Sequence, residues 1–276
     1  MNPLISVVIP HKNSFQTLRE LIDTIPDSPK VDVIVVDDKS TKEAQYELGK
    51  LAKKRNNVSV FFNESSESNA GTARNIGLEH IKGSWVFFAD ADDQFTANSF
   101  DTFYESIPEH SDSDVILFMC CSLRESGEVG DRADNLIHLI EKYPQNRNTI
   151  LYEWLVPWGR LIKASVLKKN ELRFDSCIAS NDVMFSTRLA AVTRKISVID
   201  KEVYCCFYRS GSLTSSLSEY KSLSRLKVLS DRNFFLYKNR IPIKKDIGIK
   251  YFFASKPIKI SAYKIKIYWN WVLHFF

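Results

Sequence analysis

Three carboxylates lie within four residues, at Asp90, Asp92 and Asp93. Like charges this close repel one another unless a cation or solvent neutralises them. Hard divalent ions such as Mg²⁺ and Mn²⁺ prefer oxygen ligands, and proteins commonly hold them with one or two carboxylates together with the phosphates of a substrate. Acidic turns without a metal are common. The cluster nevertheless predicts a metal site because it follows the apolar residues 86–88 directly, at the end of a buried strand.

A second acidic pair, Asp37 and Asp38, ends the apolar run at 31–36 in the same way. One of the two carboxylates is suited to accept a hydrogen bond from a nucleobase imide or a ribose hydroxyl, while the other holds the turn. The alternative is an Asx turn that caps the next helix. The pair therefore indicates a nucleotide site only in combination with other segments.

A third segment, residues 69–77 (Asn-Ala-Gly-Thr-Ala-Arg-Asn-Ile-Gly), enters a helix through small residues. Gly71 allows close backbone approach, and the electropositive start of a helix suits a phosphate. Arg74 adds a planar guanidinium that matches phosphate oxygens. By itself this is a generic helix start.

The elements that must position these residues alternate regularly over the first 120 residues. Near-continuous apolar strands between amphipathic helices predict a largely parallel sheet that is buried on both faces. Right-handed crossovers place the carboxyl ends of such strands along one edge, where ligands bind in open α/β sheets. The polar clusters at 10–13, 37–40 and 90–93 follow three of these strands, so we expect one site fed by three separate segments. The strands are predicted at 4–9, 31–36, 58–62, 84–89 and 115–120, and the helices at 18–25, 41–55, 70–81 and 98–107.

The remainder of the chain is less regular. We expect an exposed loop at 125–135, a helical segment at 148–170 and an amphipathic helix at 181–194. Residues 198–208 are predicted to form strands around a turn, and 223–237 a further helix.

The composition is that of a soluble globular protein, with 44% apolar and 26% charged residues among 276. No stretch reaches 18 uncharged apolar residues, and the N-terminus lacks the features of a signal peptide. The five cysteines are two adjacent pairs and a single residue, which favours buried thiols in a reducing compartment over disulfides. We therefore expect a cytoplasmic protein.

The tail from 240 to 276 has eight Lys or Arg residues and one acid, mixed with large aromatic residues. This mixture is typical of a surface that lies in a membrane interface. The alternative is a solvated basic face over an ordinary aromatic core. A nucleic-acid partner is disfavoured because no nucleic-acid-binding motif accompanies the charge.

Taken together, the segments at 7–13, 35–41, 71–77 and 88–93 resemble family 2 glycosyltransferases in order and spacing. The resemblance is close over about 4–122 and looser to about 215. It implies an α/β fold of the GT-A type, with a Rossmann-like, mostly parallel central sheet flanked by helices. A glycosyltransferase domain at 1–215 would comprise a nucleotide-binding half to about 122 and an acceptor half from 123 to 215. Residues 216–276 would form a variable, helical, basic and aromatic extension.

The resemblance also implies roles for individual residues. Pro10 and Asp38 would border the nucleobase, and Arg74 would lie near the nucleotide. Asp90 would lie near the ribose and the metal, and Asp92 would ligate the Mg²⁺ or Mn²⁺ ion that bridges the diphosphate.

The later motif of the family is an acidic pair, typically Glu-Asp, that opens a helix. Here Asp182 is retained and would be the catalytic base, while Asn181 replaces the glutamate. Upstream, Ser176 stands where the family has a glutamate. Trp158 and Arg160 resemble positions on the acceptor side. The alternative for Asp182 is a charge that only stabilises the start of a helix.

These inferences predict an inverting, metal-dependent glycosyltransferase. It would move a sugar from a nucleotide-linked donor, usually a UDP-sugar, to a hydroxyl of a glycan acceptor in bacterial surface polysaccharide synthesis. A lipid-linked acceptor would place the enzyme at the inner face of the membrane, in contact through 240–276. One alternative is a sugar nucleotidyltransferase, but residues 10–13 lack its Gly-rich, basic loop. The other is a catalytically impaired module that binds nucleotide sugars, suggested by Asn181 and Ser176.

Overall fold

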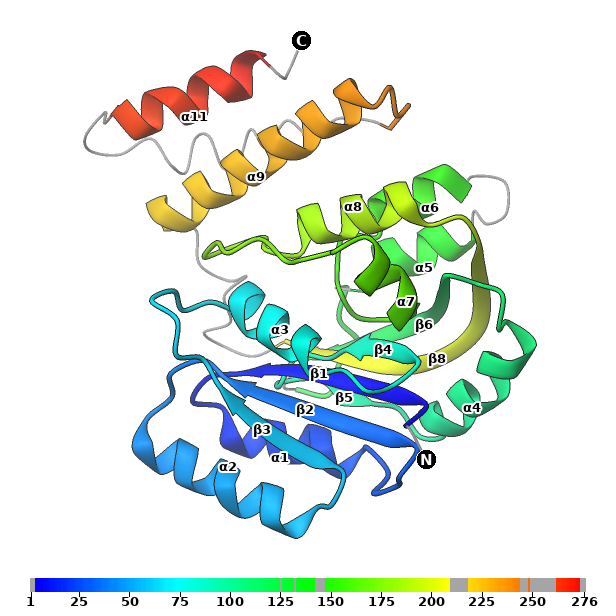
Figure 1. Ribbon diagram of the computed structural model, residues 1–276. Coiled ribbons are helices and arrows are strands. Elements are labelled where there is room, and N and C mark those ends of the chain that lie inside the picture. Colours follow the sequence, from blue (N-terminus) through cyan, green and yellow to red (C-terminus); the bar gives the residue numbers. More distant parts are fainter. Residues whose placement is uncertain are drawn as a thin grey trace.

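The computed structural model describes residues 3–124, 126–131, 133–141, 147–208, 218–243, 248 and 262–273. Eight of the described segments pair into one sheet in the order β3-β2-β1-β4-β7-β6-β8-β5, and helices cover both of its faces (Figure 1). The domain boundary predicted near residue 215 lies outside the described residues, as does much of the basic tail.

The first half of the sheet is parallel, as predicted. β1 lies between β2 and β4 and pairs in parallel with both, and β2 pairs in parallel with β3. Every residue of β2 and β4 is buried, which explains their unbroken apolar sequences. The elements are β1 (Ile5–His11), α1 (Phe15–Asp23), β2 (Val31–Asp37), α2 (Lys42–Lys54), β3 (Val58–Phe62), α3 (Ala70–Glu79) and β4 (Trp85–Phe88).

The second half mixes strand directions. β7 runs antiparallel between β4 and β6, β8 is parallel to β6, and β5 is antiparallel to β8. The elements are β5 (Gln94–Phe95), α4 (Ser99–Glu109), β6 (Val115–Arg124), α5 (Asp134–Glu141), α6 (Arg147–Glu153), β7 (Arg160–Lys163), α7 (Ala164–Lys169), α8 (Val183–Val192), β8 (Ile196–Tyr208), α9 (Glu219–Lys238) and α11 (Ala262–Leu273).

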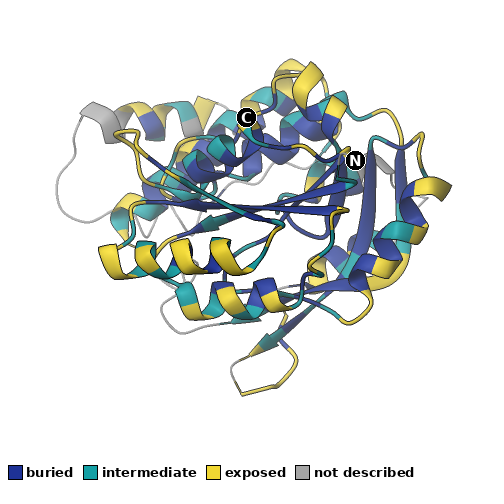
Figure 2. Ribbon diagram, turned by 60° about the horizontal axis from the view of Figure 1, so that its bottom comes forward, coloured by how far each residue is buried: buried dark blue, intermediate teal, exposed yellow. Residues whose placement is uncertain are grey.

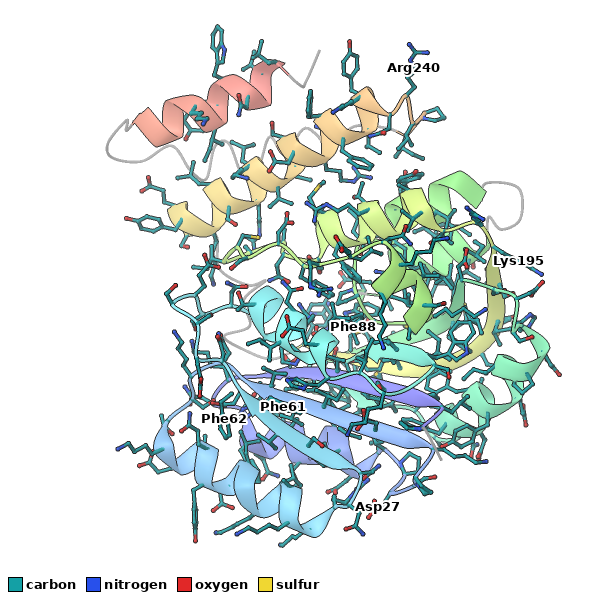
Figure 3. All side chains as sticks on the ribbon, viewed as in Figure 1. Asp27, Phe61, Phe62, Phe88, Lys195 and Arg240 are labelled. Carbon is teal, nitrogen blue, oxygen red and sulfur yellow. The ribbon has the colours of Figure 1, made fainter. Side chains whose placement is uncertain are left out.

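The helices form layers around the sheet. Figure 1 shows α1 and α2 on one face and α3 and α8 on the other, with α9 beyond α8 and α11 packed on α9. The strands are almost wholly buried, while the outer faces of the helices are exposed (Figure 2). The carboxyl ends of β1, β2 and β4 meet at one edge. Phe62, the last residue of β3, lies at this edge, and Lys195, just before β8, lies at the opposite side of the molecule (Figure 3).

The helix predicted across 148–170 is wrong in its centre. The structure has α6 and α7 at its two ends and the strand β7 between them. Pro157 precedes this strand, and Gly159 adopts a left-handed backbone with φ of +74°. A proline and a positive φ both interrupt a helix, so the chain turns here and enters the sheet.

The prediction of strands around a turn at 198–208 is also wrong, because β8 is one continuous strand. Residues 200–202 are polar and exposed, which suggests a turn in the sequence. In the structure they lie beside register shifts in the pairing with β6, where the strand bulges. The loop predicted at 125–135 is shorter than expected, because α5 begins at Asp134; residues 125 and 132 lie outside the described part.

A cluster of aromatic rings joins the two halves of the chain above the sheet. Phe88, labelled in Figure 3, meets the rings of Phe174 and Phe185 edge-on, at centroid distances of 5.0 and 5.5 Å. Phe174 and Phe185 stack on one another at 3.9 Å. The segment that leads to α8 is therefore anchored over the end of β4.

Two further observations bear on the sequence expectations. All five cysteines are free thiols, as predicted. Within the described ranges, none of the helices is both long enough and apolar enough to cross a bilayer.

Candidate active site

The two neighbouring aspartates at the end of β2 have different surroundings and different roles. Asp37 is fully buried and accepts hydrogen bonds from the backbone N–H of Ser40 (3.1 Å) and Nε2 of Gln45 (3.0 Å), with Nδ1 of His11 at 3.0 Å from its Oδ1. Burial alone would raise the pKa of Asp37, but these hydrogen bonds outweigh it and lower the pKa. Burial also lowers the pKa of His11, against the effect of Asp37. Asp37 therefore holds the turn.

Asp38 lies beside polar side chains from the segments that follow β3 and β1. Its Oδ1 accepts from Nδ2 of Asn63 (2.6 Å), its Oδ2 accepts from Oγ of Ser68 (2.8 Å), and Nζ of Lys12 lies 3.8 Å from Oδ2. Pro10, half-buried, faces Val36 across the β1–β2 pair at the same edge. Neither Asn63 nor Ser68 is among the site residues predicted from the sequence. The signal was present for Asn63, because it directly follows β3, as Asp38 follows β2.

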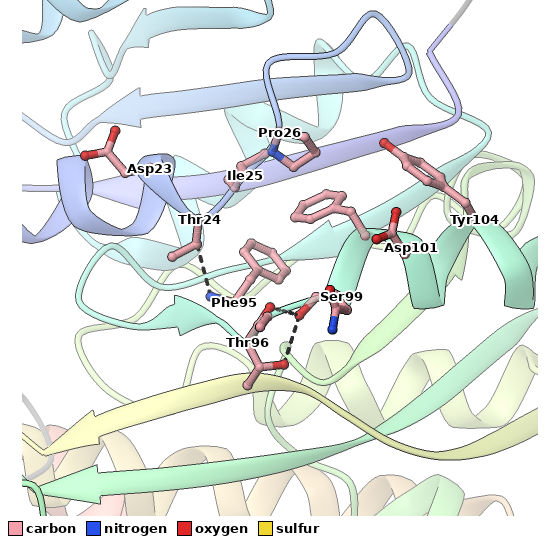
Figure 4. A pocket seen from close by; sticks show the side chains of 12 residues that line it. Asp23, Thr24, Ile25, Pro26, Phe95, Thr96, Ser99, Asp101 and Tyr104 are labelled. Atoms are coloured by element: carbon pink, nitrogen blue, oxygen red, sulfur yellow. Dashed lines mark hydrogen bonds between the residues drawn. The ribbon is translucent and has the colours of Figure 1, made fainter.

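A hollow of about 380 Å³ adjoins the end of β2 on the side of β3, where Asp37 rather than Asp38 lines it. Asn63 lines it together with exposed Phe62 and the helix-capping segment that follows Asp38. A larger hollow, of about 410 Å³, lies between the end of α1 and the start of α4 (Figure 4) and contains none of the predicted site residues.

Arg74 connects three segments that are distant in sequence. It lies on α3, is almost fully buried, and donates to Oδ1 of Asp90 at 2.5 Å and to Oδ1 of Asn181 at 2.9 Å. Its guanidinium carbon lies 5.3 Å from the centre of the Phe174 ring. One side chain of α3 thus contacts both the acidic turn after β4 and the residue before Asp182.

The loop before α8 approaches the start of α3 so closely that only glycine fits at position 71. A β-carbon on Gly71 would lie 2.3 Å from the carbonyl oxygen of Asp175 and 2.9 Å from Cβ of Asn181. Asn69, which caps α3, also donates from its side chain to Oγ of Ser176 at 2.9 Å. Ser176 and Asn181, the two departures from the family motif, therefore both fasten this loop to α3.

The acidic turn after β4 is closed by a backbone hydrogen bond from Asp93 N–H to the carbonyl of Asp90 (3.1 Å). The side chain of Asp90 is 21% exposed, Asp92 is half-buried, and Asp93 turns inward, where its Oδ1 accepts from the backbone N–H of Phe207 at 2.9 Å. Across the ranges that the structure describes, no group of three or more His, Cys, Asp or Glu side chains is placed to hold a metal ion.

Asp182 stands at the start of α8 next to these groups. Burial raises the pKa of Asp182. The positive charges of Arg74 and Arg160 lower this pKa, and the negative charge of Asp90 raises it further. Hydrogen bonds hold Arg74 between Asp90 and Asn181, the residue before Asp182. Arg160 donates to Ser186, one helical turn beyond Asp182, so these groups lie around the start of α8.

Arg160 and Trp158 are buried in the core beside Asp182. Arg160 donates to the carbonyl of Trp154 (3.3 Å) and to Oγ of Ser186 (2.8 Å), and burial lowers its pKa to about 9, with Asp182 acting in the opposite direction. Ser186 lies one helical turn after Asp182. The Trp158 ring stacks on Tyr204 at 5.9 Å. Both residues lie behind Asp182 rather than on an open surface.

The structure thus brings Arg74, Asp90, Asp182 and Arg160 together, with Asp92 on the same turn as Asp90. Pro10, near the end of β1, and Asp38, directly after β2, lie at the same edge, and β1 separates β2 from β4. Neighbouring strands are about 4.8 Å apart, so the ends of β2 and β4 are about 10 Å apart. An extended ligand rather than a single ion is needed to reach both.

Comparison with known proteins decides the family. The model for "Glycosyl transferase family 2" matches residues 6–170, which is more than half of the chain. The chain belongs to glycosyltransferase family 2. The match covers β1 to α7 and so includes Pro10, Asp38, Arg74 and the acidic turn.

The relatives of this family 2 chain include bacterial enzymes. Glycosyltransferase GlyA of Streptococcus pneumoniae is 24% identical over 89% of this chain and 36% of its own length. A poly(ribitol-phosphate) beta-glucosyltransferase of Bacillus spizizenii is 30% identical over 75% of this chain and 33% of its own length. The chain therefore spans about a third of the length of these relatives.

The fold has a close counterpart among solved structures. The crystal structure of residues 1–349 of Staphylococcus aureus TarS in complex with UDP-GlcNAc superposes with a TM-score of 0.66, over 90% of this chain and 70% of that chain, at 21% identity. This likeness confirms the predicted GT-A architecture, with a mostly parallel central sheet flanked by helices.

Proposed function

We propose that this chain transfers a sugar from a UDP-linked donor to a hydroxyl group of a bacterial surface glycan, with inversion at the anomeric carbon. The observation that carries the proposal is the position of Arg74, which bridges Asp90 and Asn181 next to Asp182. Family membership supports sugar transfer, and the TarS complex supports a UDP-linked donor because that neighbour binds UDP-GlcNAc. The Bacillus relative supports a cell-wall glycan as acceptor.

The donor would lie along the edge of the sheet from Asp38 to Asp90. Asp38 accepts hydrogen bonds from Asn63 and Ser68, which hold its carboxylate at the end of β2, where the nucleobase or ribose would meet it. Arg74 would face the diphosphate, since its guanidinium is held at the turn that follows β4. The two strand spacings between the ends of β2 and β4, about 10 Å, suit a nucleoside diphosphate.

Asp182 would act as the base. In a single inverting displacement, the acceptor hydroxyl loses its proton to the carboxylate while its oxygen bonds to the anomeric carbon, and the bond from that carbon to the diphosphate oxygen breaks on the opposite side. A hydroxyl is a poor nucleophile until its proton is removed, so a carboxylate within hydrogen-bond reach is required. The raised pKa of Asp182 makes it a stronger base than an exposed aspartate.

A divalent cation, Mg²⁺ or Mn²⁺, fits the acidic turn if it arrives with the donor. Asp90 and Asp92 supply carboxylate oxygens at a partly exposed turn, and diphosphate oxygens would complete the ligand set that such ions take. When bound, the cation would stabilise the negative charge that develops on the departing diphosphate. Asp93 is unsuited to join it, because its Oδ1 is turned toward the backbone of Phe207.

The alternatives are weaker on structural grounds. A nucleotidyltransferase needs a flexible, Gly-rich grip after the first strand, whereas His11 is buried against Asp37 at that point. A non-catalytic module would not need a carboxylate held with a raised pKa between Arg74 and Arg160.

The proposal is tested by measuring the turnover of a panel of UDP- and GDP-sugars with and without Mn²⁺. The natural chain is compared with Asp182→Asn. We expect metal-dependent release of UDP from one UDP-sugar, slowed by about 10²- to 10⁴-fold in Asp182→Asn. Calorimetric binding of UDP should be retained in that variant. UDP binding without turnover of any donor by the natural chain would instead support the binding module.

We further propose that the acceptor is lipid-linked and that the enzyme works at the inner face of the membrane, in contact through 240–276. Arg240 lies at the end of α9 that points away from the sheet (Figure 3), and Lys266 is exposed on α11. Exposed aromatic and aliphatic side chains gather on the same two helices, where they can enter a lipid interface beside basic groups. They are Tyr220, Phe234, Tyr237, Trp269, Val272 and Leu273.

Co-sedimentation of the full chain with vesicles of phosphatidylglycerol or phosphatidylcholine tests the membrane contact. We expect binding to the anionic vesicles only, weakened by salt and by the double change Trp269→Ser with Leu273→Ser. Tyr46→Ser, which removes an equally exposed aromatic residue from α2, should change nothing. Equal binding of the double variant and the natural chain would contradict the proposal.

A further inference from the structure

The strand β8 contacts the acidic turn at the backbone of Asp90 and at Asp93, whereas Arg74 contacts the side chain of Asp90. The backbone N–H of Asp90 donates to Oη of Tyr204 at 2.8 Å, and the backbone N–H of Phe207 donates to Oδ1 of Asp93 at 2.9 Å. One strand therefore contacts both ends of the turn that carries Asp90 and Asp92.

The chain that leaves the turn is fastened to the same strand. β5 pairs with β8, with Phe95 opposite Tyr204, and Thr96 N–H donates to the carbonyl of Val203 at 3.1 Å. Oγ of Ser99 donates to the same carbonyl at 2.7 Å. Figure 4 shows the neighbouring bonds, from Phe95 N–H to Oγ1 of Thr24 and between Thr96 and Ser99.

The hydroxyl of Tyr204 is held rigidly. The residue is fully buried, and its ring contacts Trp158, Phe87 and Phe95 at centroid distances of 5.9, 5.4 and 5.4 Å. The ring therefore holds the hydroxyl in place as a fixed hydrogen-bond partner of the Asp90 backbone.

We propose that Tyr204 is a positioning residue for the donor: its hydroxyl fixes the backbone at Asp90, so that Asp90 and Asp92 present their oxygens to the cation and diphosphate in one arrangement. The proposal rests on the proposed function, because it assigns Tyr204 to the same donor site. Groups that orient metal-binding carboxylates typically change metal affinity by about 10- to 100-fold when they are removed. Without the hydroxyl, the N–H of Asp90 loses its acceptor and the turn gains freedom.

Calorimetric titration of UDP into the full chain, at increasing Mn²⁺, tests this role in Tyr204→Phe. The variant keeps the ring and its packing but lacks the oxygen. We expect the Mn²⁺ concentration needed for half-maximal UDP binding to rise by about 10- to 100-fold. Saturating Mn²⁺ should restore UDP affinity, and UDP binding without Mn²⁺ should be unchanged.

Tyr208→Phe is the matched control. It removes a hydroxyl from the same strand, where Oη donates to Oδ1 of Asp131 at 2.5 Å, away from the acidic turn. We expect its Mn²⁺ requirement to equal that of the natural chain.

The outcomes separate the two proposals. An unchanged Mn²⁺ requirement in Tyr204→Phe overturns the role of Tyr204 and leaves the proposed function standing. A loss of UDP binding that saturating Mn²⁺ does not restore, accompanied by a lower thermal midpoint, also overturns it, because the hydroxyl would then serve only the fold. If the natural chain binds no UDP at any Mn²⁺ concentration, the proposed function fails as well.

Discussion

The two halves of this chain contribute to the site in different ways. In the parallel half, β1 to β4, Asp38 and the acidic turn follow strands, and the order of the strands alone brings them to one edge. In the second half, Asp182 and Tyr204 are positioned by contacts with distant segments: α3 fastens the loop before α8, and the aromatic core holds the ring beside the acidic turn. The first half builds its part of the site through topology, and the second through specific side-chain contacts. Substitutions at those contacts therefore test whether the two halves build the site in these different ways.

Arg74→Met should have the largest effect on the fold, because it removes the side chain that joins the halves. It leaves the carboxylate of Asp90 and the amide oxygen of Asn181 without their shared donor. Removal of one partner of a buried ion pair costs about 3–5 kcal/mol of unfolding free energy, and we expect the lower end because Asp90 is partly exposed. Urea denaturation measures this.

The matched control is Arg188→Met, which breaks the more exposed pair with Asp175. Such a pair is worth about 0–1 kcal/mol. Equal losses in the two variants would mean that Arg74 does not join the halves.

Gly71→Ala should have an intermediate effect, because the new β-carbon would press against Asp175 and Asn181. The loop must move away from α3, which typically costs about 1–3 kcal/mol. Gly49→Ala, in a helix with no atom within 4 Å of the added carbon, should instead stabilise the chain by about 0.5–1 kcal/mol. Thermal unfolding of both variants gives the comparison, and a stabilised Gly71→Ala would show that the loop is not held closely.

The smallest effect concerns the pH dependence of sugar transfer. A base acts only when ionised, so kcat/KM should fall as the pH drops through the pKa of Asp182, and the raised pKa places this fall above the range of an exposed aspartate. Arg160→Met removes a charge that lowers this pKa, so the fall should move to higher pH.

The matched control is Arg188→Gln. Arg188 lies on α8, the helix that begins at Asp182, but it is paired with Asp175, so the pH profile of this variant should match that of the natural chain. A profile of Arg160→Met that coincides with the natural one would remove Arg160 from the electrostatics of the site.

The sequence predicts the first half well because its physical signals are local. A strand covered on both faces must be apolar throughout, so β1, β2 and β4 stand out, and the polar residues after them mark the edge of the sheet. Family resemblance supplied the role of Asp182, which no local pattern distinguishes from a helix-capping charge.

The second half is less predictable because its elements depend on partners in space. β7 has only four residues and is recognisable mainly by the Pro157 and Gly159 interruption before it, while β8 carries exposed polar residues at a bulge. Tyr204 has no signal of its own, since one buried tyrosine in an apolar strand resembles any other. Its hydrogen bond to Asp90 spans more than a hundred residues and becomes visible only when the chain is folded.

One side chain on α3 bears on how the site forms. Asn75 gives Phe174 both of the hydrogen bonds that a neighbouring strand would provide: its Nδ2 donates to the carbonyl at 2.9 Å, and its Oδ1 accepts from the N–H at 2.8 Å. These bonds close a long loop, and closing a long loop costs chain entropy that local contacts do not. We therefore expect the segment that carries Asp182 to settle on α3 after the local contacts of the parallel half have formed.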